Sequence, residues 1–194
     1  MLVRMPVMKN SFARAHLLLA IAGGIACHSA GVATPPRTES RASAPWSGTP
    51  LTLAAVPAVY LAVWRSAENR DQCALLAPKA LAPDLARRAN VRAATFSGGW
   101  GIAYDLPEQR SAFGVAGTGA SAWDDYIYDA WPEKRVFADS SRVGYGPEGG
   151  TGPNWLAYVR IPGQQCLYNV WSRRGRAELE ELLADLRFVT VKQH

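Results

Sequence analysis

The first 26 residues of this 194-residue chain have the layout of an export signal. Residues 1–16 carry three basic residues and no acidic one, and an apolar run of ten residues, LLLAIAGGIA, follows them. A run of this length is too short to cross a bilayer, which takes about 20 apolar residues. We therefore predict a signal peptide over residues 1–26 and a body that folds outside the cytoplasm, in the periplasm or cell envelope.

The residues around Cys27 decide whether the exported chain is tethered or free. Gly24-Ile25-Ala26-Cys27 resembles a bacterial lipobox, in which a small residue precedes a cysteine that receives a diacylglycerol, with Gly24 where that pattern usually has Leu or Val. The resemblance implies lipidation of Cys27, so that a lipid ties the chain to the membrane. The alternative is ordinary signal cleavage after Ala33, which small residues also precede.

The chain has three cysteines, and two remain once Cys27 is lipidated or removed. In an oxidising compartment this pair, Cys73 and Cys166, predicts a disulfide. The bond would close a loop of 93 residues, for which loop entropy gives about 4–5 kcal/mol of stabilisation. The alternative is a pair of free buried thiols.

Composition divides the rest of the chain in two. Residues 27–50 are rich in Ser, Thr, Pro and Ala and lack apolar periodicity, so they are expected to form a flexible tether. Residues 51–191 are long enough for one globular domain. Apolar spacing within this domain predicts a single α+β fold with one disulfide, an antiparallel sheet of about four to six strands and two main helices.

The expected elements follow from residue spacing and from the positions of Pro and Gly. The two main helices are predicted over 121–131 and 176–187, with a helical turn within 73–81. Strands are predicted over 58–64, 95–104, 111–118, 155–161, 165–172 and 188–191. In the hairpin of 155–161 and 165–172, a turn at Pro162-Gly163 would place Val159 opposite Cys166.

Two of these strands have one bulky face and one nearly bare face. In 95–104, Phe96, Trp100, Ile102 and Tyr104 alternate with Gly and Ala, and 111–118 has the same pattern. Paired as a hairpin, the strands would join their bare faces into a flat patch. We expect a helix to cover this patch, the alternative being close approach of a ligand or another backbone.

The chemistry available to the body is limited by its residue types. The three histidines are His16, His28 and His194, so residues 51–191 contain none, which excludes Ser-His-Asp and Cys-His catalysis and the usual zinc sites there. No cofactor or metal is expected. The excess of basic over acidic residues falls from five to two when the signal is removed, so nucleic acid is not an expected partner.

Residues 139–154, DSSRVGYGPEGGTGPN, are expected to form one long glycine-rich loop. Long loops in compact domains are often functional, and this one carries five polar side chains suited to recognition: Arg142, Tyr145, Glu148, Thr151 and Asn154. The alternative is that the loop only connects two elements.

These observations predict an exported, lipid-anchored protein that is not an enzyme and that acts as a binding or interaction module for an envelope macromolecule or a small ligand. The alternative is a carboxylate-dependent hydrolase of extracytoplasmic glycans. Its acids would be Asp124, Asp125 and Glu148.

Overall fold

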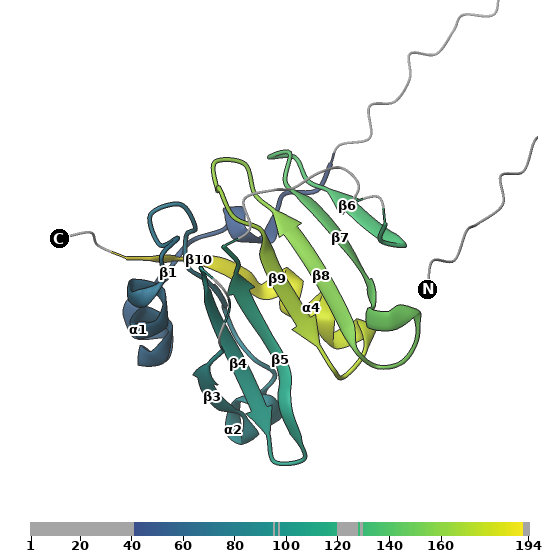
Figure 1. The fold of residues 1–194 in the computed structure, drawn as a ribbon, viewed down its shortest axis with the longest axis horizontal. Coiled ribbons are helices and arrows are strands. Elements are labelled where there is room, and N and C mark those ends of the chain that lie inside the picture. The colour runs from purple at the N-terminus through teal and green to yellow at the C-terminus, as the bar shows by residue number, and fades with distance from the viewer. Residues whose placement is uncertain (1–40, 95, 97, 120–127, 129, 192–194) are drawn as a thin grey trace, which may run out of the picture. The chain divides into compact units, whose positions relative to one another are not determined.

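The computed structural model describes residues 41–94, 96, 98–119, 128 and 130–191. Their main element is a seven-stranded antiparallel sheet in the order β3-β4-β5-β9-β8-β7-β6 (Figure 1). In that order the strands are Asn90–Ala93, Trp100–Leu106, Gln109–Gly117, Tyr168–Ser172, Trp155–Arg160, Arg142–Pro147 and Glu133–Val136. The α+β class and the antiparallel sheet are confirmed. The sheet is larger than the four to six strands that we predicted.

A smaller sheet has the order β1-β10-β2 and contains Leu51–Thr52, Leu186–Thr190 and Leu76–Pro78. The described helices are α1 (Ala58–Ser66), α2 (Pro83–Arg88) and α4 (Arg176–Asp185), with short 3-10 turns η1 (Pro45–Ser47), η2 (Leu53–Ala55) and η3 (Glu148–Gly150). Within the described part of the chain, no helix has the length and hydropathy needed to span a membrane. The helix predicted over 121–131 lies almost wholly outside the described residues.

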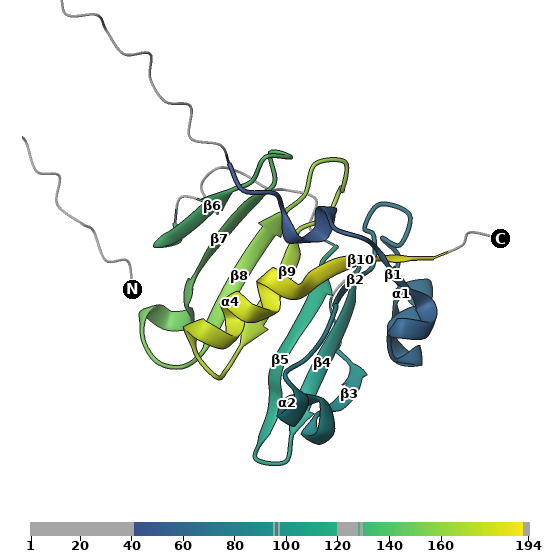
Figure 2. The same cartoon turned by 180° about the vertical axis from the view of Figure 1, so that it is seen from behind.

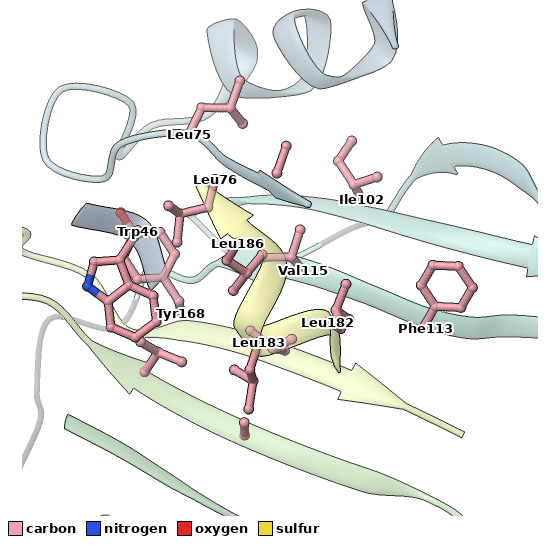
Figure 3. Packing of buried hydrophobic residues seen from close by; sticks show 14 of the residues in the cluster. Trp46, Leu75, Leu76, Ile102, Phe113, Val115, Tyr168, Leu182, Leu183 and Leu186 are labelled. Carbon is pink, nitrogen blue, oxygen red and sulfur yellow. The ribbon is translucent and has the colours of Figure 1, made fainter. Parts of the chain in front are cut away.

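One face of the large sheet packs into the core, and α4 and β10 lie across it (Figure 2). Helix α4 follows the helix predicted over 176–187 as far as Asp185, because Leu179, Leu182 and Leu183 form one apolar stripe and all three are buried. The last two predicted residues belong to β10. Figure 3 shows Leu182 and Leu183, together with Leu186 of β10, packed against Phe113 and Val115 of the sheet. We call this side of the sheet the core face.

The folded body begins before residue 51, within the segment that we expected to be a tether. Trp46 of η1 is 1% exposed and packs edge-on against Phe137. Its indole Nε1–H donates to Ser141 Oγ at 3.0 Å and to Asp139 Oδ2 at 3.2 Å. The prediction of a tether over residues 27–50 therefore extended too far, because composition alone did not reveal that this tryptophan has a buried position.

Two local predictions were wrong. Residues 58–64, predicted as a strand, lie in helix α1. Pro57 precedes the helix, and only the positions one turn apart, Tyr60 and Trp64, are buried in it; a short apolar run fits a strand or a helix equally well. The helical turn expected within 73–81 is strand β2, which pairs with β10.

The predicted disulfide between Cys73 and Cys166 is present, with its Cα atoms 5.5 Å apart. It also explains an error in strand register. Val159 lies opposite Tyr168 instead of Cys166, because residues 161–167 form a loop that docks on the segment around Cys73. In that docking, the Gln165 N–H donates to Gln72 O at 2.9 Å and the Ala74 N–H donates to Gln164 Oε1 at 2.7 Å.

Candidate functional site

The side of the large sheet opposite the core face carries glycines on three strands, and we call it the glycine face. Its glycines are Gly101 on β4, Gly114 on β5, and Gly144 and Gly146 on β7. A Cβ on Gly101, Gly114 or Gly146 would meet a neighbouring ring, and one on Gly144 would press against Trp131 at 3.0 Å. These glycines therefore allow large side chains to lie flat on the sheet. Figure 1 looks onto this face, with α4 behind the strands.

Among the described residues, two aromatic rings and no helix lie over the patch of bare strand faces. The Phe96 ring occupies the space above Gly101, and the Trp171 ring occupies the space above Gly114. The two ring centroids are 5.9 Å apart with the planes tilted by 40°. These glycines are therefore in contact with aromatic rings, and the described residues do not test the helical cover that we predicted. The assignment of Phe96 to the bulky face of β4 was wrong. Trp171 reaches the patch because β9 pairs with β5, which hairpin spacing does not reveal.

A short chain of contacts holds Trp171 in place. Its indole Nε1–H donates to Ser111 O at 3.3 Å. Ser111 has a positive φ of 52°, and its N–H donates to Asp105 Oδ1 at 2.7 Å. Arg92 completes the group through Nε to Asp105 Oδ2 at 2.8 Å. The bond from Arg92 and the Ser111 N–H lower the pKa of Asp105, so this carboxylate stays ionised and keeps the turn fixed.

Beside Trp171 the glycine face is hollowed to a volume of about 560 Å³. We call this the polar hollow. Its cations are Arg92, Arg110 and Arg173, and Glu148 is the one carboxylate among its described lining residues. Arg92 is paired with Asp105, whereas Arg110 and Arg173 have no ion pair within 4 Å among the described residues. Two arginines against one carboxylate leave the polar hollow electropositive.

The floor of the polar hollow includes an unsatisfied polar atom. Asn169 of β9 is half-buried, and its Oδ1 is buried without a hydrogen-bond partner. Tyr158 lies directly opposite Asn169 on β8 and packs edge-on against Trp131, with ring centroids 5.6 Å apart. Burial, and then the charge of Glu148, raise the pKa of Tyr158, so its hydroxyl remains a donor at neutral pH.

The structure separates the five residues predicted as a recognition loop. Glu148 and Asn154 both line the polar hollow, and the Glu148 N–H donates to Asn154 O at 2.7 Å. Tyr145 lies on the core face, where its hydroxyl donates to Glu180 at 2.6 Å. Arg142 stacks over the Tyr128 ring at 5.7 Å, and Thr151 is exposed.

Residues 139–154 are thus not one loop, because β7 occupies 142–147. Gly144 and Gly146 lie in this strand and allow close packing beneath Trp131 and Pro132, whereas we had expected them in a loop. The alternation of Val143 and Tyr145 with these glycines is the signal that could have identified a strand. For the predicted acids, Asp124 and Asp125 lie outside the described residues, as does Cys27.

Sequence reasoning missed most of the residues that line the polar hollow. Arg92 and Arg173 were not among the predicted site residues, and Trp171, Asn169 and Tyr158 were assigned only to strands. The neighbouring Arg174 and Arg176 do form ion pairs, with Glu178 and Glu133. Among the described residues, no cluster of His, Cys, Asp and Glu could hold a metal ion.

Comparison with known proteins gives no match for this chain among family models, curated proteins or solved structures. The case for a functional site therefore rests on the geometry of these residues. That geometry is a fixed aromatic ring on a rigid sheet, bordered by cations, a carboxylate and an unsatisfied amide oxygen.

Proposed function

We propose that this chain is an exported, lipid-anchored envelope protein whose folded body binds a negatively charged ligand in the polar hollow. The observation that carries this proposal is the placement of Trp171, whose ring lies against Gly114 and whose Nε1–H is held by Ser111 O. A ring fixed in this way loses little conformational entropy on binding. Small-molecule sites typically combine such apolar surfaces with a few well-placed polar groups.

The charge of the expected ligand follows from the arginines. Arg110 and Arg173 are exposed at the mouth of the polar hollow, and Glu148 neutralises at most one of them. Guanidinium groups form paired hydrogen bonds with carboxylates and phosphates. An anionic group beside Arg110 and Arg173 would therefore be favoured over a neutral one.

Export and anchoring are supported by the layout of residues 1–26, the lipobox-like residues before Cys27 and the Cys73–Cys166 disulfide. Disulfides persist in oxidising compartments and are rare in the cytosol. In this proposal the lipid on Cys27 holds the protein at the membrane, and residues between Cys27 and Ala44 place the body away from the lipid surface.

Binding is tested by saturation-transfer NMR of the full chain with a panel of small carboxylates, phosphates and neutral sugars. Acidic compounds should bind the wild type, and binding should fall at least tenfold in the Arg110→Ala/Arg173→Ala double variant. The control is Arg65→Ala/Arg87→Ala, which removes the same charge from two exposed helical residues outside the hollow. Equal loss in both double variants would contradict a specific site.

Anchoring is tested separately by metabolic labelling with a fatty acid. The wild-type chain should incorporate label, and the Cys27→Ser variant should not. A labelled Cys27→Ser chain, or an unlabelled wild type that starts at Thr34, would overturn the anchor without affecting the binding site.

The alternative function, a glycan hydrolase, remains a prediction, and the purified chain and its variants can test it. It needs two carboxylates on either side of a glycosidic bond. Glu148 lines the polar hollow, and the partner acid would be Asp124 or Asp125. Glycan turnover that is lost in Glu148→Gln and Asp125→Asn variants with intact folding would favour hydrolysis over binding.

A further inference from the structure

A second hollow adjoins the first on the glycine face. It has a volume of about 470 Å³, and its lining is mainly apolar, with Trp131, Pro132, Pro147 and Tyr158 joined by the glycines of η3. We call it the apolar hollow. Tyr158 lines both hollows and is the residue that they share. The two hollows are therefore neighbours along the sheet, with one aromatic side chain between them.

We propose that the two hollows form one extended site for an acidic oligosaccharide of at least two sugar units. An acidic sugar would lie in the polar hollow beside Arg110 and Arg173, and the next sugar would lie across Tyr158 in the apolar hollow. This inference rests on the proposed function, since it names the ligand class for the same site.

The distance between the hollows suits a chain of sugars. Trp171 stands on β9 with its ring reaching over Gly114 of β5, and Trp131 packs over Gly144 of β7, so two to three strand spacings separate the two rings. At about 4.8 Å for each spacing, the rings are about 10–14 Å apart, which exceeds one pyranose ring. A ligand that uses both hollows must therefore be longer than a monosaccharide.

The side chains of both hollows suit sugars. The rings of Trp171, Tyr158 and Trp131 supply π faces, whose negative charge attracts the partly positive C–H groups on one side of a pyranose. Asn154 and the arginines supply flat polar groups that can bond two neighbouring hydroxyls together. A sugar chain has this alternation of C–H faces and polar edges along its whole length.

A peptide strand fits this place less well. Extended peptides commonly bind by adding a strand to a sheet edge. The edges here are β3 and β6, whereas Trp171 and Tyr158 stand on β9 and β8, which pair with strands on both sides. Their backbone groups are used within the ladder, so recognition at this place must come from side chains.

The test measures affinity against chain length by calorimetry on the full chain. The probes are galacturonate, its dimer and trimer, hyaluronan oligosaccharides of matched length, and the neutral galactose trimer. The acidic trimer or its hyaluronan equivalent should bind at least tenfold more tightly than the acidic monosaccharide, and the neutral trimer should bind more weakly than the acidic one.

Tyr158 variants show whether the gain with length depends on the second hollow. Tyr158→Ala should abolish the gain in affinity with chain length, whereas Tyr158→Phe, which retains the ring, should preserve that gain. Near-ultraviolet circular dichroism and the count of free thiols check that each variant folds and keeps its disulfide.

The outcomes separate the inference from the proposed function. If the acidic monosaccharides bind but length brings no gain, or if Tyr158→Ala keeps the full gain, the extended site is wrong and the polar hollow stands alone. If no acidic probe binds and the panel of small anions also fails, the proposed function fails. Equal binding of neutral and acidic trimers would overturn the acidic ligand class.

Discussion

Replacing Asn169 with Val should stabilise the protein and weaken ligand binding at the same time. Asn169 Oδ1 is buried without a hydrogen-bond partner, and its side chain stands on β9 in the interior of the sheet. An unsatisfied buried polar group costs about 1–3 kcal/mol. Val removes that group, is close to Asn in size and is a better strand former.

We expect Asn169→Val to raise the free energy of unfolding by about 1–2 kcal/mol, because part of the gain is offset by imperfect packing of the new side chain. For a domain of this size, that corresponds to a rise in Tm of about 2–8 °C. Urea unfolding followed by fluorescence measures the free energy, and calorimetry with trigalacturonate measures affinity, which should fall at least fivefold.

A matched control comes from Asn69, whose Oδ1 is also buried without a partner. Its Nδ2 donates to Gly117 O at 3.3 Å and to Thr118 O at 2.9 Å, so Asn69→Val leaves two acceptors without their donor. This variant should be destabilised by about 1–3 kcal/mol. If Asn169→Val is destabilised in the same way, its amide has a stabilising role in the free protein and our reasoning about the polar hollow is refuted.

Three further predictions concern the fold. Reducing the Cys73–Cys166 bond should lower the free energy of unfolding by about 4–5 kcal/mol, measured by urea unfolding with and without reductant; a change below 1 kcal/mol would contradict the loop-entropy argument. Trp46→Ala should lower the free energy of unfolding by about 3–5 kcal/mol, because the indole is 1% exposed. An unchanged free energy of unfolding would mean that this segment belongs to the tether and not to the folded body. Burial raises the pKa of Tyr104 to about 12, and burial also raises that of its hydrogen-bonded neighbour Tyr60. Above pH 10 the unfolded state therefore binds fewer protons than the native state, and stability falls as pH rises toward 12. A Tyr60→Phe/Tyr104→Phe variant should lose less stability over that interval, and an unchanged slope of stability against pH would refute this.

Elements with a strong local signal were predictable from the sequence. Helix α4 has three buried leucines at helical spacing, and β4 and β5 have alternating side chains joined by a short turn. The disulfide followed from counting cysteines in a chain that we predicted to be exported. The residues that define α4, and those that define β4 and β5, are close in sequence. Cys73 and Cys166 are the two cysteines that are left when Cys27 is set aside.

Features that depend on long-range pairing were not predictable in the same way. The residues of α1 fit a strand as well as a helix until the burial of Tyr60 and Trp64 is known. The candidate site depends on β9 pairing with both β5 and β8, which brings Trp171 over Gly114 and places Asn169 opposite Tyr158. Hairpin spacing predicted that β8 neighbours β9, but it does not show that β5 also pairs with β9, so the polar hollow could not be foreseen.

The most direct test of the binding site on the glycine face is the indole N–H spectrum of the ¹⁵N-labelled full chain during titration with trigalacturonate. We predict that the Trp171 Nε1–H resonance shifts and saturates, while those of Trp46 and Trp64, which are buried in the core, do not move. An unmoved Trp171 signal at a ligand concentration that saturates binding would place the ligand elsewhere and contradict the account.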